Sequence, residues 1–181
     1  FMTRKALIII DVQNDYFKDG RFPLIQPELA LDNILKLEKY FKENNQLIVY
    51  VQHVNFSKDA AFFEHDTPGV EIREEFDIND DSVIVQKQTP NSFFNTNLQD
   101  ILDQHHIEEV VISGMMTHLC VDSTTRTSKE LGYSTTLVKD ATATRDLEYD
   151  DSTVKAQDVQ HAFISALANF STVVSTEEYL K

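Results

Sequence analysis

The sequence is poor in the residues that form crosslinks, since Cys120 is its only cysteine. A single cysteine cannot form an internal disulfide or supply a structural zinc site, so this thiol is either inert core or a chemical group. The chain also lacks a run near the ~20 apolar residues that a membrane helix needs, and it lacks a basic segment leading into a signal-peptide core. We therefore expect a cytoplasmic protein that does not bind membranes.

Basic residues are scarce as well. Lys and Arg total 16 against 30 Asp and Glu, which gives a formal net charge of -14, and no basic cluster stands out along the chain. Such a surface repels phosphate backbones and anionic lipids, so nucleic acid is not an expected partner. We expect the partner to be a small-molecule substrate.

The length and the apolar content allow one sizeable core. At 181 residues with 41% hydrophobic content, the chain predicts a single domain, placed at residues 2–181 because Phe1 precedes Met2. Helical stripes extend from Ala30 to Phe41 and from Val159 to Phe170. Short apolar runs, typical of strands buried on both faces, occur at 6–10, 47–51, 83–85, 110–112, 136–138 and 172–174. This alternation predicts an α/β fold with a mainly parallel sheet.

Three chemically active side chains follow predicted strands. Asp11 ends the first run, Lys87 follows the third, and Cys120 follows the fourth after a short turn. In open parallel sheets, ligands bind beyond the carboxyl ends of the strands. Each residue alone is more often a cap, a surface charge or a buried apolar thiol, but their joint placement predicts one pocket. The long segment 55–81 predicts a functional loop that is packed by its own aromatic side chains.

The residues around Cys120 favour a nucleophilic role. Thr117 can cap a helix whose first turn then includes Cys120. The positive end of the helix dipole and a nearby Lys87 both favour the thiolate. We therefore expect a thiol pKa below the ordinary ~8.5 and rapid alkylation near neutral pH. Backbone N–H groups in the same turn can hold a developing oxyanion.

Four segments together resemble the isochorismatase-like cysteine hydrolases. They are residues 6–15 (ALIIIDVQND), Lys87 with 92–98 (SFFNTNL), 111–121 (VISGMMTHLCV), and Gly132-Tyr133 with 138–141 (VKDA). They occur in the family's order and span nearly the whole chain. The resemblance implies a Rossmann-like three-layer sandwich with a central six-stranded parallel sheet.

The resemblance also implies a mechanism. Asp11 would act as general base, Lys87 as its electrostatic partner and Cys120 as nucleophile. A cis peptide would join Met115 to Met116, and the N–H groups of Met116 and Cys120 would form the oxyanion hole. The thiolate would attack the carbonyl of a small amide, ureido or carbamoyl substrate, release ammonia or an amine, and leave a thioester for water to hydrolyse.

Other activities of similar proteins stay open from the sequence. Nicotinamidases carry an Asp-x-His metal motif, whereas Val51 and Gln52 precede His53 here, so we expect no metal and no cofactor. Isochorismatases proper cleave a vinyl ether and commonly lack the cysteine. A non-catalytic scaffold would keep the same fold.

Substrate contacts are expected from two loops, residues 16–27 and 55–81. The candidate pocket residues are Phe17, His53, Phe56, Phe62 and Thr117. Members of the family are commonly oligomers, so we also expect a homo-oligomer.

Overall fold

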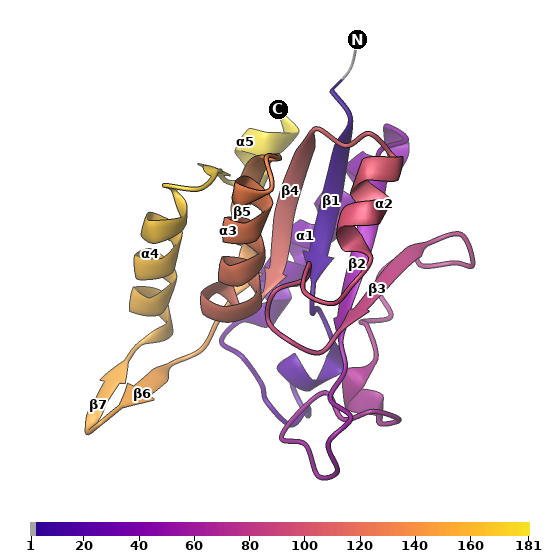
Figure 1. The fold of residues 1–181 in the computed structure, drawn as a ribbon. Helices are drawn as coiled ribbons and strands as arrows, with labels where there is room; N and C mark the ends of the chain where they lie inside the picture. Colours follow the sequence, from indigo (N-terminus) through magenta and orange to yellow (C-terminus); the bar gives the residue numbers. More distant parts are fainter. Residues whose placement is uncertain (1–2) are drawn as a thin grey trace.

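The fold is built around one six-stranded parallel sheet. The computed structural model describes residues 3–181 (Figure 1), so the expected start at Met2 lies outside the described residues. The strand order is β3-β2-β1-β4-β5-β8, and every neighbouring pair is parallel. The predicted fold class and the six parallel strands are confirmed. The strands are β1 (Lys5–Ile10), β2 (Leu47–His53), β3 (Val83–Lys87), β4 (Glu109–Met115), β5 (Ser134–Ala143) and β8 (Thr172–Val174).

Helices cover both faces of the sheet and complete three layers (Figure 1). One face is covered by α1 (Pro27–Glu43) and α5 (Thr176–Leu180). The other face is covered by α2 (Leu98–Gln104), α3 (Asp122–Glu130) and α4 (Ala156–Leu167). None of the helices in this part of the chain is long and apolar enough to span a bilayer.

The central strand β1 shows why a continuous apolar run marks a buried parallel strand. Leu7 and Ile9 pack into the core beneath α1, whereas Ala6, Ile8 and Ile10 pack into the core on the opposite face. Because helices cover both faces, residues 6–10 are all buried, and the sequence there shows no polar alternation.

The order of the strands reverses beside β1. The chain passes from β1 through β2 to β3 and then returns to the other side of β1 to form β4. A reversal of this kind opens a crevice at the carboxyl ends of the two strands, where α/β folds bind ligands. Asp11 follows β1 and Cys120 follows β4, so both residues lie at this switch point.

Two parts of the fold depart from the sequence predictions. A separate antiparallel hairpin pairs β6 (Leu147–Tyr149) with β7 (Ser152–Val154), whose mostly exposed residues form no apolar run that would predict a strand. The predicted second helical stripe is one turn too long, because α4 ends at Leu167. The Phe170 N–H closes a tight turn on the Leu167 carbonyl (2.9 Å), and the Phe170 ring then lies under the Arg126 guanidinium.

The segment 55–81 packs against the body of the protein through its aromatic residues, as predicted. Phe63 and Phe76 are buried in the core that lies beneath α1, and Phe62 packs against that core. Apart from the short 3-10 helix η2 (Pro68–Val70), this segment is irregular.

Candidate active site

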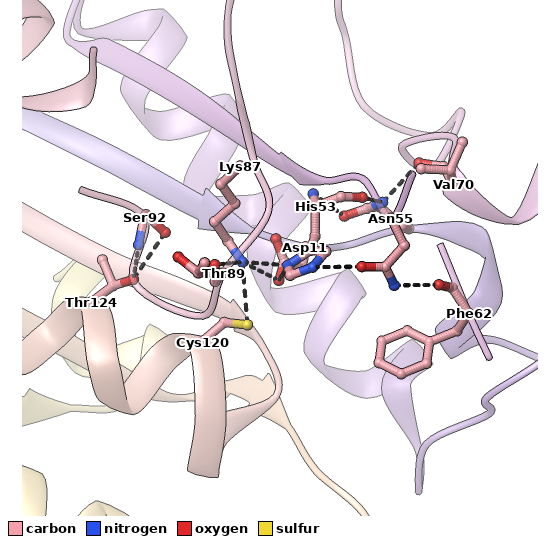
Figure 2. Close-up of polar contacts among 11 residues, drawn as sticks. Asp11, His53, Asn55, Phe62, Val70, Lys87, Thr89, Ser92, Cys120 and Thr124 are labelled. Atoms are coloured by element: carbon pink, nitrogen blue, oxygen red, sulfur yellow. Dashed lines mark hydrogen bonds and ion pairs between the residues drawn. The ribbon is translucent and has the colours of Figure 1, made fainter. Parts of the chain in front are cut away.

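Asp11, Lys87 and Cys120 meet at the carboxyl edge of the sheet (Figure 2). Lys87 Nζ lies 3.0 Å from Asp11 Oδ2 and 3.3 Å from Cys120 Sγ. All three residues are buried: Asp11 is 0% exposed, Lys87 is 2% exposed and Cys120 is 5% exposed. Buried ionisable groups that lie this close together are characteristic of functional sites.

Backbone geometry sets the direction of two of these side chains. Asp11 has a φ of 54°, in the left-handed region that aspartate tolerates better than most residues. Its N–H donates to the Val51 carbonyl (3.0 Å). Lys87 is the last residue of β3 and pairs in register with His53 at the end of β2. Both side chains therefore leave the sheet at the same edge.

The Lys87 ammonium is the centre of the site. Besides Asp11 and Cys120, its Nζ contacts the Thr89 carbonyl (3.0 Å) and His53 Nδ1 (2.9 Å). Burial lowers the pKa of Lys87, but the Asp11 carboxylate and the hydrogen bonds to Asp11 and Cys120 outweigh burial and raise the pKa above its ordinary value. Lys87 is therefore a cation throughout the neutral range.

The turn that carries Cys120 differs from the predicted helix start. Residues Thr117–Val121 form a single π-helical turn, η3, and α3 begins only at Asp122. The capping position is Met116, whose carbonyl accepts from the Val121 N–H (3.2 Å), so Thr117 does not cap the helix. Thr117 Oγ1 is instead buried without a hydrogen-bond partner among residues 3–181.

A glycine is required just before this turn. Gly114 has a φ of 122°, and a Cβ at this position would lie 2.1 Å from the Ile10 carbonyl oxygen of the neighbouring strand. The peptide bond between Met115 and Met116 is cis. The use of the Met116 and Cys120 N–H groups as an oxyanion hole stays a prediction.

The expectation of a lowered thiol pKa is wrong for the free protein. Burial raises the pKa of Cys120 well above its ordinary value, and the Asp11 carboxylate raises it further, while Lys87 opposes both effects only in part. The helix end and Lys87 do favour the thiolate, but the loss of water around the buried sulfur outweighs them. At neutral pH, the resting site holds a neutral thiol beside an ammonium–carboxylate pair.

Alkylation of the single thiol tests this protonation state. We expect iodoacetamide to label folded wild-type protein slowly at pH 7, with the rate rising only in alkaline solution. Asp11→Asn removes a charge that raises the thiol pKa, so it should accelerate labelling at pH 7 by about tenfold for each unit of pKa removed. Intact mass measured against time gives both rates. A wild-type rate that titrates near the ordinary ~8.5 would contradict the raised pKa.

The predicted pocket residues divide into two groups. His53 contacts Lys87, and Thr117 lies in the same turn as Cys120. The rings of Tyr16, Phe22, Phe62 and Phe63 pack on one another and form an aromatic wall. In this wall the Phe62 ring packs on Phe22 at 4.6 Å and on Tyr16 at 5.8 Å, and the Phe63 ring lies 5.9 Å from the ring of His53.

The other two predicted pocket residues pack against charged or polar side chains. Phe17 is buried beneath the Arg73 guanidinium, at 4.4 Å, and Phe56 is 56% exposed and packs on His65. The roles of Phe17 and Phe56 as substrate contacts stay predictions. The loop between them is fixed by the Phe63 N–H, which donates to the buried Asp15 carboxylate (2.7 Å).

Several residues at the site were not predicted. Tyr16 is buried, and the pKa of its hydroxyl is raised first by burial and then by the charge of Asp11. Gln13 is fully buried, and its side chain bonds both the N–H (2.8 Å) and the carbonyl (2.9 Å) of His53. In the sequence, the only sign that Tyr16 and Gln13 belong to the site is that both lie close to Asp11.

The potential metal ligands do not fit a metal site. Ligand atoms of Asp11, His53 and Cys120 all lie within 4.8 Å of one another. However, the Lys87 ammonium contacts all three residues, so a side-chain cation already occupies the place where a metal ion would bind. The carboxylate of the Asp-x-His motif is also absent, because residue 51 is valine.

Comparison with known proteins decides the family. The sequence profile of the Isochorismatase domain matches residues 5–178. The chain belongs to the isochorismatase family. The family protein YddQ of Bacillus subtilis is 41% identical over 177 residues, which is 97% of this chain and 98% of YddQ.

Two further proteins of the family extend the comparison. The structure of an isochorismatase from Pseudomonas putida KT2440 superposes with a TM-score of 0.91 at 30% identity, covering 97% of this chain and 89% of that one. The ureidoacrylate amidohydrolase RutB of Variovorax paradoxus is 25% identical, covering 76% of this chain and 68% of RutB. This protein is thus an isochorismatase-family hydrolase.

Proposed function

We propose that this hydrolase cleaves a C–N bond of a small amide, ureido or carbamoyl substrate through a Cys120 thioester. The observation that supports the proposal is the buried Lys87 ammonium, 3.0 Å from the Asp11 carboxylate and 3.3 Å from the Cys120 sulfur. These groups are a base, a fixed cation and a nucleophile in contact, which is the arrangement that nucleophilic catalysis requires.

The first half of the reaction forms the thioester. Asp11 accepts the thiol proton, and the Cys120 sulfur attacks the substrate carbonyl carbon. The N–H groups of Met116 and Cys120 hold the negative oxygen of the tetrahedral intermediate. Asp11 then returns the proton to the leaving nitrogen, the C–N bond breaks, and ammonia or an amine departs.

The second half releases the acid. Asp11 takes a proton from water, the resulting hydroxide attacks the thioester carbonyl, and the C–S bond breaks. The Cys120 thiolate that leaves is stabilised by the Lys87 ammonium until it regains the proton from Asp11. Lys87 keeps its own proton throughout, because its neighbours raise its pKa.

The thiol favours this reaction over the alternatives. Vinyl ether cleavage needs no sulfur nucleophile, and a scaffold gains nothing from three buried ionisable groups that are expensive to desolvate. Asp11 Oδ1 has no hydrogen-bond partner among the residues that the structure describes. That unpartnered oxygen is free to accept the proton.

A second cation favours substrates that carry an anionic group. The Arg145 guanidinium lies 4.5 Å from the ring centre of Phe22, within the aromatic wall, and close enough to Tyr16 to oppose the rise in its pKa. Within residues 3–181, the one hydrogen bond of Arg145 runs from Nε to the Asp146 carbonyl (3.1 Å). Its two Nη atoms are free to hold a carboxylate in bidentate fashion.

The test is an ammonia-release screen. Ureido acids and carbamoyl amino acids are compared with matched amides that lack the carboxylate, and isochorismate is assayed in parallel. We expect ammonia release to be highest for the acidic substrates and to disappear in Cys120→Ala. Cleavage of the vinyl ether that survives Cys120→Ala would overturn the proposal in favour of the isochorismatase reaction.

Activity is expected to be independent of metal. In residues 3–181, Asp11, His53 and Cys120 form the only cluster whose side chains could together bind a metal ion. Because the Lys87 ammonium lies at the centre of this cluster, exhaustive chelation should leave kcat/KM unchanged. The measurement is the rate before and after EDTA or phenanthroline, followed by addition of zinc, iron or manganese. A rate that collapses on chelation and returns with one of these metals would support a nicotinamidase-type site.

A further inference from the structure

The surroundings of Lys87 hold one more acceptor than its ammonium has protons. Nζ has three N–H donors. It contacts Asp11 Oδ2 at 3.0 Å, the Thr89 carbonyl at 3.0 Å, His53 Nδ1 at 2.9 Å and the Cys120 sulfur at 3.3 Å. With Cys120 as a neutral thiol, the three shorter contacts use all three protons.

The bond to His53 requires one tautomer of the imidazole. His53 Nε2 faces Asn55 Oδ1 at 3.2 Å, and Asn55 Nδ2 donates to the Phe62 carbonyl at 2.6 Å (Figure 2). A carbonyl only accepts, so the amide orientation of Asn55 is set, and its oxygen must receive a proton from Nε2. This leaves Nδ1 with a lone pair aimed at the Lys87 ammonium.

The position of His53 is fixed independently of this bond. The Gln13 side chain holds its backbone on both sides, and its ring packs on Phe63 with centroids 5.9 Å apart. Burial lowers the pKa of His53, and the Lys87 charge lowers it further, against a smaller opposing effect of Asp11. The ring is therefore neutral at pH 7.

We propose that His53 is a positioning residue: its unprotonated Nδ1 accepts one proton of the Lys87 ammonium and, with Asn55 fixing the ring, aims the other protons at Asp11 and Thr89. This extends the catalytic site into the loop that begins at Asn55. The ammonium of a lysine can rotate about its bond to the side chain. With Asp11 and Thr89 accepting two of its protons, His53 Nδ1 is the third acceptor and fixes the ammonium of Lys87 in one orientation.

The arrangement has a consequence for the pH dependence of the reaction. The groups that face His53 are Asp11 just after β1, Lys87 from β3, Cys120 from η3 and Asn55 from its own loop. A proton on Nδ1 would set an imidazolium against the ammonium and break the bond. The acid limb of kcat/KM therefore follows protonation of His53 and lies below the ordinary ~6.5 of histidine.

Two substitutions should move this limb in opposite directions. Asn55→Asp places a carboxylate beside Nε2, which raises the pKa of His53 and moves the acid limb upward by about one pH unit. His53→Asn keeps an acceptor near Nδ1 that does not titrate, so activity stays within about tenfold of wild type and the limb moves downward. His53→Leu fills the space without offering an acceptor. This variant should lower kcat/KM by roughly 100-fold, which is the loss expected when a catalytic group is misplaced.

Gln52→Met is the matched control. Gln52 lies beside His53, and its side chain holds the same loop through the Val70 carbonyl (2.9 Å) without contacting the triad. It should leave the acid limb in place. If Gln52→Met shifts the limb as Asn55→Asp does, the limb reports the packing of the loop and not His53. If His53→Leu matches wild type, the acceptor on His53 plays no part. Either result overturns the proposal.

The tautomer can be measured without turnover, which separates this proposal from the proposed function on which its kinetic arm rests. In protein labelled with ¹⁵N-histidine, the signals lost in His53→Asn identify His53. We expect a neutral ring protonated at Nε2 at pH 7. A ring protonated at Nδ1 at pH 7 would overturn the inference, even if an amide substrate were found.

Discussion

Cys120→Ala is expected to lower kcat/KM by roughly a million-fold, the scale of loss when the nucleophile of a hydrolase is removed. The chain has no second cysteine that could substitute for it. Cys120→Ser should also be inactive, because a hydroxyl in this buried site holds its proton more tightly than a thiol. The measurement is single-turnover and steady-state ammonia release with the best amide from the screen.

The folded state should survive this change. Cys120 is buried, but it packs as a small side chain, so its truncation should cost about 1 kcal/mol of unfolding free energy. Thermal unfolding of the variant provides the control. A folded Cys120→Ala protein that still hydrolyses the amide would show that the nucleophile is misassigned.

Asp11→Asn is expected to lower kcat by about 100- to 10,000-fold, because general bases contribute on that scale. Asparagine is the informative replacement, since it tolerates the φ of 54° at this position and still accepts a hydrogen bond from Lys87. It cannot, however, accept the thiol proton. The loss should therefore appear in kcat, with the same variant showing faster alkylation of Cys120.

Asp15→Asn is the matched control for this variant. Asp15 is also a buried carboxylate, but its oxygens accept from the backbone N–H groups of Arg21 (3.0 Å) and Phe63 (2.7 Å). Its role is to join two loops, so its replacement should lower stability and keep kcat within about tenfold of wild type. Equal losses of kcat in both variants would mean that Asp11 acts through structure and not as a base.

The parts of the fold that could be predicted are those where burial leaves a pattern along the chain. The six strands appear as apolar runs, and α1 shows its buried stripe from Ala30 to Phe41. By contrast, α3 buries Thr124, Thr125 and Ser128, whose hydroxyl groups are satisfied by hydrogen bonds. A helix with polar buried residues leaves no apolar periodicity, so its packing is visible only in three dimensions.

The sequence by itself determined the fold class, the family and the edge of the sheet where Asp11, Lys87 and Cys120 meet, because parallel strands place their carboxyl ends together. Only the tertiary structure decided the protonation state of the site. The thiol pKa depends on the balance between lost water, a carboxylate and an ammonium, and this balance changes over fractions of an ångström. The contact of His53 with Lys87 was likewise decided in space, since 34 residues separate them along the chain and only the pairing of β2 with β3 brings them together.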